Sequence, residues 1–231
     1  MAHVNVTILA AGLGTRLGRP FPKPLTPLAD GRSIMHQQVD NIVEVFGDAA
    51  RVRVVVGYKH DLVMEHVPDL VFCYNENYDQ TNTNRSLLKA LRSSPEGGMV
   101  WMNGDVVFEP AILHRLEKYI REDQTAIAVN TSAVADEEVK YTVDDQGMVK
   151  ALSKSVVDGL GESVGINYVS STDKETLIRR LAECEDQDYF ERGIELAIEN
   201  DALKVVPVDI SDLFAVEVDS DADLTQANAR R

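Results

Sequence analysis

The sequence contains few cysteines and few aromatic residues. Among 231 residues there are only two cysteines, Cys73 and Cys184, and the aromatic fraction is 6%. Two cysteines far apart in the chain predict neither a disulfide framework nor a cysteine-based metal site, and we expect reduced thiols in a cytoplasmic protein. An aromatic cage for a quaternary ammonium group is also disfavoured, because such a cage needs several rings.

Basic residues and long hydrophobic runs are scarce as well. Lysine and arginine number 23 against 38 acidic residues, so the formal net charge is −15. This charge argues against nucleic acid or an anionic membrane as the main partner, but an anionic small molecule needs only local positive charge. The apolar run near the N-terminus is interrupted by Asn5 and Thr7, so we expect neither a signal peptide nor a membrane span.

Strand and helix patterns alternate in the first half of the chain. Short apolar runs predict strands at 4–9, 51–56, 70–74, 98–103 and 125–130, with helices at 33–46, 61–66, 86–91 and 110–121 between them. Ser33 is placed to cap the first of these helices. The alternation predicts an α/β fold with a Rossmann-like, mostly parallel sheet flanked by helices.

The second half has a different pattern. Asp144-Asp145-Gln146-Gly147 separates two short runs, 140–143 and 148–152, and predicts a β-hairpin. Further strands are expected at 165–170, 203–208 and 215–218, with helices at 173–184, at 188–199 and from residue 220. We expect one domain over residues 1–231. Residues 1–130 would bind a nucleotide, and residues 131–231 would supply a small hairpin-containing acceptor lid and a C-terminal metal-ligand segment.

The strongest functional signal follows the first strand. Residues 9–18 read LAAGLGTRLG, and residues 22–25 read PKPL. Glycines let the backbone approach a ligand and direct its N–H groups at phosphate oxygens, while Arg16 and Lys23 supply positive charge. Residues 1–29 contain no aspartate or glutamate, so this loop is locally positive in an acidic chain. It predicts a site for nucleotide phosphates.

Other glycine-rich motifs fit less well. A dinucleotide fingerprint opens a helix with G-x-G-x-x-G, whereas Leu17 occupies the third glycine position and Pro20, Pro22 and Pro24 prevent an immediate helix. A Walker-type loop needs Gly-Lys followed by Ser or Thr, which this loop lacks. A surface loop with unrelated cations is the remaining structural alternative.

An aspartate follows the strand predicted at 98–103. Asp105 stands at the carboxyl end of that strand, where parallel sheets bind their ligands. Mg²⁺ prefers one or two carboxylates together with substrate phosphates, so Asp105 is a candidate Mg²⁺ ligand. The alternative is a turn formed by Gly104 and Asp105.

The loop LAAGLGTRLG with PKPL resembles the signature of the sugar-phosphate nucleotidyltransferase superfamily, which includes MobA-like domains. The resemblance implies that Arg16 and Lys23 are catalytic and neutralise phosphate charge during transfer. It implies that Asp219, in Glu217-Val218-Asp219, completes the Mg²⁺ site with Asp105, leaving Glu217 structural or outside the ligand shell. It also implies that the nucleotide lies on the backbone of Leu9, Ala10, Ala11, Gly12, Gly14 and Thr15.

This arrangement would join two anions. A metal held by the two aspartates would bridge the nucleoside triphosphate and an acceptor phosphate, and pyrophosphate would leave. A general base is not needed, because an acceptor phosphate or phosphonate is already ionised. The five histidines show no ligand spacing, and no Ser/His/Asp or Cys/His constellation is evident.

Residues 74–87 resemble a segment of a small branch of cytidylyltransferases that act on phosphocholine, phosphonates and inositol phosphate. Its amide-rich composition makes Asn84 and Ser86 candidates for reading the base, and CTP is the favoured donor. The alternative is an Asx turn that caps a helix. UTP, GTP or dTTP with a sugar 1-phosphate is an alternative pair of substrates.

Positions in the C-terminal half resemble the family's acceptor pocket. Two lysines there suit a small phosphate or phosphonate acceptor, and Glu162 or Glu191 could meet a cationic or hydroxyl group. The low aromatic content disfavours choline. Solvated charges are the alternative explanation for each position. The candidates are Lys140, Lys154, Glu162, Tyr189 and Glu191.

Two other functional classes remain possible at this point. A non-catalytic nucleotide-binding regulatory protein would need neither metal carboxylate, so Asp105 and Asp219 count against it. An NAD(P)-dependent dehydrogenase is disfavoured by Leu17 and the prolines that follow it. Family resemblance further suggests a homodimer.

Overall fold

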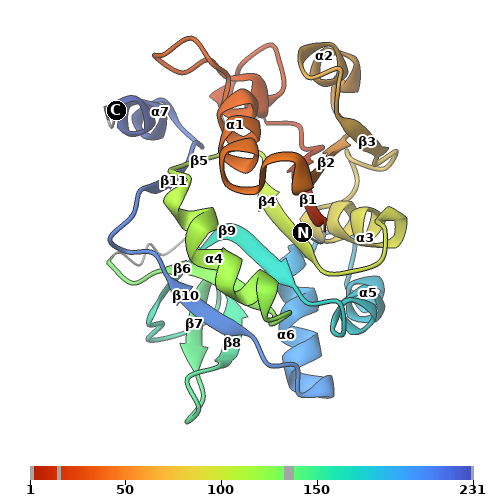
Figure 1. Cartoon of the computed structure of the whole chain (residues 1–231), viewed down its shortest axis with the longest axis vertical. Coiled ribbons are helices and arrows are strands. Elements are labelled where there is room, and N and C mark those ends of the chain that lie inside the picture. The colour runs from red at the N-terminus through yellow and green to blue at the C-terminus, as the bar shows by residue number, and fades with distance from the viewer. Residues whose placement is uncertain (1–2, 15–16, 133–137, 230–231) are drawn as a thin grey trace.

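The computed structural model describes residues 3–14, 17–132 and 138–229. A central sheet has the strand order β10-β6-β9-β4-β1-β2-β3 (Figure 1). Strands β1 to β4 are parallel to one another, and β9 lies antiparallel between β4 and β6. The predicted mostly parallel α/β sheet is confirmed. The strands are β1 (Val4–Ala10), β2 (Ala50–Val56), β3 (Val71–Tyr74), β4 (Met99–Asn103), β6 (Ala126–Asn130), β9 (Gly161–Val169) and β10 (Val206–Asp209).

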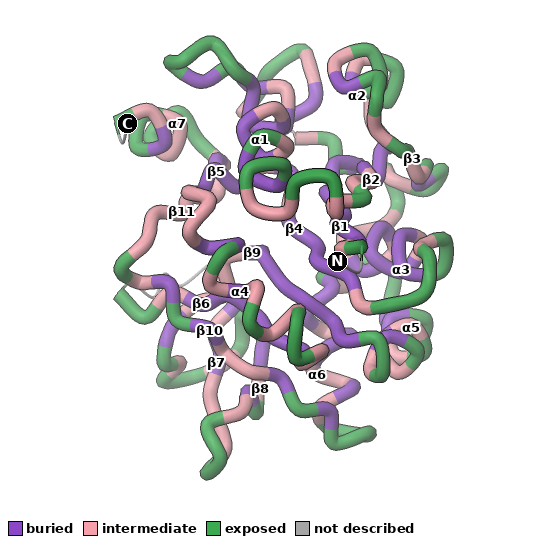
Figure 2. Tube along the Cα trace, in the orientation of Figure 1, coloured by how far each residue is buried: buried purple, intermediate pink, exposed green. Residues whose placement is uncertain are grey.

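The central strands are apolar on both sides because helices cover both faces of the sheet. In β4, Met99 and Trp101 join one core cluster and Val100 and Met102 the other, as the alternation of a strand requires. Figure 2 shows these buried strands in the middle of the molecule. One face is covered by α3 (Thr83–Ser93), α5 (Lys174–Glu183) and α6 (Phe190–Asp201), the other by α1 (Ile34–Phe46), α2 (His60–His66) and α4 (Ala111–Arg121).

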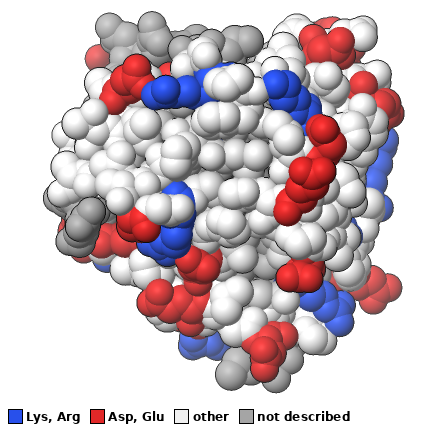
Figure 3. Space-filling view, turned by 90° about the horizontal axis from the view of Figure 1, so that it is seen from above, with Lys and Arg blue, Asp and Glu red and all other residues white. Residues whose placement is uncertain are grey.

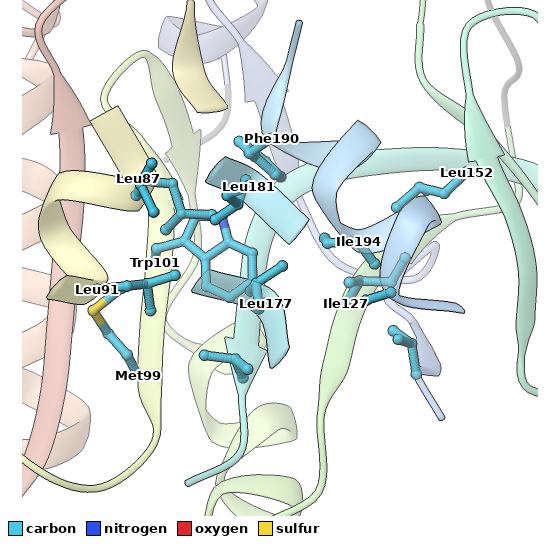
Figure 4. Close-up of a cluster of buried hydrophobic side chains, with 14 of the residues drawn as sticks. Leu87, Leu91, Met99, Trp101, Ile127, Leu152, Leu177, Leu181, Phe190 and Ile194 are labelled. Carbon is cyan, nitrogen blue, oxygen red and sulfur yellow. The ribbon is translucent and has the colours of Figure 1, made fainter. Parts of the chain in front are cut away.

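The first of these clusters fixes the start of α6. The Trp101 ring packs edge-on against Phe190, with ring centroids 5.6 Å apart. Leu87 of α3 and Leu181 of α5 belong to the same cluster (Figure 4). Burial of one large apolar side chain contributes about 1.5–3 kcal/mol. The first turn of α6, which carries Glu191, is therefore anchored on the sheet.

The C-terminal segment returns to the end of β4. Strand β5 (Val106–Phe108) pairs antiparallel with β11 (Ala215–Glu217), and Glu217 lies opposite Val106. The backbone N–H of Val218 donates to the Asp105 carbonyl at 2.9 Å. Helix α7 (Asp221–Ala229) follows. Segments far apart in the sequence thus meet beside Asp105.

The predicted hairpin is formed by β7 (Lys140–Val143) and β8 (Val149–Ser153). Strand β7 also pairs with β9, where Lys140 lies opposite Glu162. The hairpin is thus joined to the sheet. Its role as an acceptor lid, and the single-domain organisation, remain predictions.

Several local predictions can be compared with the structure. Ser33 caps α1, because its side chain accepts a hydrogen bond from the His36 N–H. The long glycine-proline loop contains a short 3-10 turn, Lys23–Leu25. Helix α3 spans Thr83–Ser93 and contains the predicted helical residues 86–91. Asn84 therefore lies in the first turn of this helix.

The surface agrees with the acidic composition. Basic and acidic side chains are interspersed on the face shown in Figure 3. Within the described ranges, every helix is too short or too polar to cross a lipid bilayer.

Candidate active site

A cavity of about 330 Å³ opens at the carboxyl ends of β1 and β4. Its walls come from the loop after β1, the turn after β4, the start of α3, strand β9, the start of α6 and the segment after β11. This is the edge at which α/β sheets bind ligands. Ten of the predicted site residues line it: Leu9, Ala10, Gly12, Gly14, Lys23, Asp105, Lys154, Tyr189, Glu191 and Asp219.

Close backbone approach brings the two sheet loops together. The Gly104 N–H donates to the Leu9 carbonyl at 2.9 Å. A Cβ at Gly104 would lie 2.7 Å from that same oxygen, so no larger residue fits without movement. Gly14 has a φ of +61°, which favours glycine, and it packs against Lys23. These glycines allow Lys23 and Asp105 to face the same cavity.

Lys23 connects the phosphate loop to two carboxylates. Its side chain is largely buried, and its Nζ lies 2.6 Å from Asp105 Oδ2 and donates also to Asp219 Oδ1. Burial disfavours the charged ammonium, but the two carboxylates outweigh it and raise the pKa of Lys23 above its usual value. The lysine is therefore a fixed positive charge at the cavity floor.

Local capping places Asp219. The Asp223 carboxylate accepts hydrogen bonds from the backbone N–H groups of Asp219 and Ser220, at 3.1 and 2.7 Å. Asp221 forms an ion pair with Arg19 at 2.7 Å. Neither Asp221 nor Asp223 joins Asp105 and Asp219; both lie in the first turn of α7, where negative charge is favourable.

Glu217 belongs to the carboxylate group, whereas the family resemblance implies that it lies outside the ligand shell. Oxygens of Asp105, Glu217 and Asp219 all lie within 4.8 Å of one another. The Asp105 charge, then burial and Asp219, raise the pKa of Glu217 to about 9, although Lys23 opposes the shift. The available signal was the spacing of two residues between Glu217 and Asp219 at the end of the strand predicted at 215–218.

The carboxylate group suits a divalent cation. It offers only oxygen ligands, which Mg²⁺ prefers. Asp105 Oδ1 is buried and has no hydrogen-bond partner in the described part of the chain. Asp105, burial and Asp219 raise the pKa of Glu217, so a further cation would stabilise the ionised form of the three carboxylates. The residues present therefore fit Mg²⁺.

The other end of the cavity contains the candidate acceptor residues. Lys154 Nζ lies over the Tyr189 ring, 4.6 Å from its centroid. Glu191 is only 7% exposed, and burial raises its pKa to about 7. Glu138 also lines this end and raises the pKa of Glu191 further, whereas Lys154 lowers it. This end thus combines one lysine with two glutamates.

Comparison with known proteins identifies the family. Residues 6–183 match the MobA-like NTP transferase domain. The chain belongs to this family. Its predicted place in the nucleotidyltransferase superfamily is confirmed, and the dehydrogenase alternative is excluded.

Two curated relatives of this MobA-like chain are larger proteins. The CMP-5′-(3-aminopropyl)phosphonate synthase of Streptomyces rubellomurinus is 32% identical over 254 residues, covering 98% of this chain and 38% of that protein. The bifunctional protein GlmU of Bdellovibrio bacteriovorus is 33% identical over 133 residues, covering 57% of this chain and 28% of GlmU. The chain therefore spans about two fifths of the first relative's length.

Solved structures share the fold of the MobA-like domain. The inositol-1-phosphate CTP transferase from T. maritima superposes with a TM-score of 0.76 at 14% identity, covering 100% of this chain and 98% of that one. The CTP:phosphocholine cytidylyltransferase LicC from Streptococcus pneumoniae gives 0.73 at 18% identity, covering 98% of each chain. At these identities the likeness is one of fold.

Two predicted base-reading residues lie outside the cavity of the MobA-like domain. Asn84 is fully buried, and its Nδ2 donates to the Glu185 carbonyl at 2.6 Å. Ser86 is buried too, and its Oγ accepts a hydrogen bond from Asn75. Both side chains are buried on the inner side of α3, and the geometry does not support base reading by either one. Asn82 and Thr83 line the cavity in their place.

Other predicted residues are also absent from the cavity wall. Lys140 and Glu162 lie opposite each other in the register of β7 and β9. Ala11 is buried in a core cluster, and its carbonyl accepts the Tyr58 N–H at 3.1 Å. Of the phosphate loop, Thr15 and Arg16 lie outside the described residues.

Proposed function

We propose that this MobA-like domain transfers CMP from CTP to a small phosphorylated or phosphonate acceptor, with Mg²⁺ as cofactor and pyrophosphate as the second product. The observation that carries the proposal is the convergence of Lys23, Asp105 and Asp219 on one cavity beside the glycine loop. CTP as donor is further supported by the curated relative named for a CMP-phosphonate product.

The loop after β1 and the carboxylates at the strand ends would have different roles in the reaction. Backbone N–H groups of the loop after Leu9 would hold the triphosphate, and Lys23 would stabilise negative charge at the α-phosphate. Asp105, Glu217 and Asp219 would hold Mg²⁺. When bound, the ion supplies charge neutralisation and an in-line arrangement of the two phosphate groups. Arg16 remains the predicted partner of the β- and γ-phosphates.

The bond changes need no proton transfer by the protein. An anionic oxygen of the acceptor forms a bond to the α-phosphorus, and the bond from that phosphorus to the bridging oxygen of the β-phosphate breaks. Pyrophosphate leaves with the electron pair. The acceptor oxygen is already ionised, so the site contains what the reaction requires without a general base.

Pyrophosphate release provides the test. The protein would be assayed with CTP, UTP, GTP, ATP or dTTP against aminoethylphosphonate, phosphocholine, inositol phosphate, glycerol phosphate and sugar 1-phosphates. Release that requires CTP and one acceptor class, stops with a chelator and returns with Mg²⁺ would establish the proposal. Release with UTP, GTP or dTTP and a sugar 1-phosphate would show that these are the substrates in place of CTP and the proposed acceptor. Nucleotide binding without turnover would favour a regulatory protein.

The cellular location and the oligomeric state remain predictions. A cytoplasmic location was expected from reduced thiols, and a homodimer was expected from family resemblance. Light scattering of the purified chain would test the dimer directly.

A further inference from the structure

The turn between β2 and α2 contacts the loop after β1 at two points. The Tyr58 N–H donates to the Ala11 carbonyl at 3.1 Å, near the start of the loop. The Lys59 ammonium donates to the Pro20 carbonyl, where the loop returns. A Cβ at Gly57 would lie 2.6 Å from the Ala11 carbonyl oxygen, so a glycine is needed for this close approach. One turn thus holds two backbone carbonyls of the loop.

Lys59 does not suit its own position in the backbone. Its φ is 44°, and it is one of four non-glycine residues in the described ranges with a positive φ. This left-handed conformation is costly for a residue with a Cβ. Lys59 is also the N-cap of α2, where a side chain that accepts hydrogen bonds is preferred, and its side chain does not cap the helix. Local preference therefore does not explain a lysine here.

The contacts of the Lys59 side chain lie outside its own helix. Besides the Pro20 carbonyl, the ammonium meets the Tyr58 ring, 5.4 Å from its centroid. A hydrogen bond from a charged donor is stronger than one from a neutral donor, and the ring face attracts the same cation. Positions that break a local rule while a tertiary contact compensates are typical of functional sites. These contacts direct attention to the loop that Lys59 holds.

The held loop is the one that faces the cavity. Gly12 and Gly14 line the cavity between the two held carbonyls, and Lys23 lines it just beyond them. Gly14 packs against Lys23, so the outgoing and returning limbs of the loop are in contact. Among the described residues that line the cavity, neither Tyr58 nor Lys59 is found. The turn can therefore fix the shape of the loop without touching a ligand of the loop.

We propose that Lys59 is a positioning residue for the loop after β1, and that its bond to the Pro20 carbonyl gives this loop its nucleotide-binding shape before the nucleotide arrives. The inference rests on the proposed function, since it takes the loop as the site of the triphosphate. A loop that is ordered in advance loses less conformational entropy on binding. Loss of the ammonium should therefore weaken nucleotide binding and leave the chemical step unchanged.

Substitutions at Lys59 separate the ammonium from the backbone strain. Lys59→Met removes the ammonium and keeps a Cβ in the left-handed conformation, whereas Lys59→Gly removes both. We expect each to raise the dissociation constant and the KM of CTP with Mg²⁺ by about tenfold, with kcat within about twofold. Lys59→Gly should nevertheless melt about 2–4 °C above Lys59→Met, because it relieves the strain. Lys59→Arg keeps a charged donor and should bind CTP within about threefold of the wild type.

Ala202→Gly is the matched control. Ala202 has a φ of 53° at the end of α6 and does not belong to the described cavity wall. The change should raise the melting temperature by about 2–4 °C and leave CTP binding and turnover unchanged. If Lys59 only supported the fold, CTP affinity would follow the melting temperature across these variants. A positioning role predicts that affinity follows the ammonium.

The outcomes separate this inference from the proposed function. Wild-type affinity for CTP in Lys59→Met, recovered affinity in Lys59→Gly, or a loss in Lys59→Arg as large as in Lys59→Met would each overturn the inference while cytidylyl transfer stands. A fall in kcat at unchanged KM would also overturn it, because Lys59 would then act on the chemical step.

Failure of the proposed function gives a different result. If the wild type binds CTP but releases no pyrophosphate with any acceptor, the proposed function fails, and the dissociation constants still decide the inference. If the wild type binds another nucleotide in place of CTP, the same comparison is made with that nucleotide. If it binds none, the inference and the proposed function fail together.

Discussion

The two ends of the cavity handle buried charge in opposite ways. At one end, Lys23 is held by Asp105 and Asp219, and this pairing raises the pKa of the lysine. At the other end, burial raises the pKa of Glu191, because its carboxylate has little compensation from the protein. Charge that the fold balances can hold phosphates and a metal in place. Charge that the fold leaves unbalanced can select a ligand.

Removal of a metal carboxylate should have the largest effect on activity. Asp105→Asn keeps the shape of the side chain but removes a charge next to Lys23. We expect kcat to fall by on the order of 10³ or more, because both metal affinity and the position of Lys23 depend on that charge. Pyrophosphate release measures the effect. Asp212→Asn, which breaks a surface ion pair with Arg115, is the control and should leave kcat unchanged.

Substitution of Lys23 tests the same end of the cavity by removing its positive charge. Lys23→Met should lower kcat by about 10²–10³, as loss of one preorganised donor does elsewhere. Lys89→Met removes an exposed pair with Glu76 and provides the comparison. Near-normal turnover of Lys23→Met would contradict the mechanism, because Lys23 would then have only a structural role.

Substitution of Asn84 tests whether this residue reads the base or supports the cavity wall at the acceptor end. Asn84→Ala removes the bond to the Glu185 carbonyl, which precedes Tyr189 and Glu191 in the chain. We expect KM for the acceptor to rise about tenfold, with nucleotide preference and KM for CTP within about twofold, because a displaced wall misplaces its contacts. Asn200→Ala is the control, since the Asn200 side chain donates to the Leu196 carbonyl within α6. A changed ratio of CTP to UTP use would instead indicate that Asn84 reads the base.

The smallest effect concerns stability. Burial raises the pKa of Glu191 in the folded state to about 7 from its ordinary value of 4.5, so the folded state binds the extra proton. The ligand-free protein is then stabilised at acid pH and loses about 3 kcal/mol as the pH rises through about 7. Glu191→Gln has no such loss. Its melting temperature should exceed that of the wild type by several degrees at about pH 8 and by little at about pH 5. A constant difference across this range would contradict the assigned burial.

Local patterns predicted much of the fold and several of the residues that line the cavity. Ser33, the glycine loop and the turn at Gly104-Asp105 each act within a few residues, so their positions follow from neighbours in the chain. Asp105 could be predicted because the ends of parallel strands share one edge of the sheet, and Lys23 because the loop after the first strand is locally positive. The family match over residues 6–183 agrees with the family that the long loop motif resembles.

Other site features depended on element boundaries. The helix that contains residues 86–91 extends back to Thr83, so Asn84 belongs to its first turn and not to a preceding loop. Asn84 thereby became an internal support, and Asn82 and Thr83 reached the cavity. Composition alone does not fix such a boundary, because the turn formers of residues 75–84 fit several starts.

By itself the sequence determined the alternation of strands and helices, the electropositive loop in an acidic chain and the candidate carboxylates. Only the tertiary structure decided that Glu217 joins Asp105 and Asp219, through the pairing of β11 with β5. It alone decided that Lys154 lies over the Tyr189 ring and that Glu191 is buried beside it. The physical reason is that charge balance depends on distance in space, which long-range strand pairing and burial set.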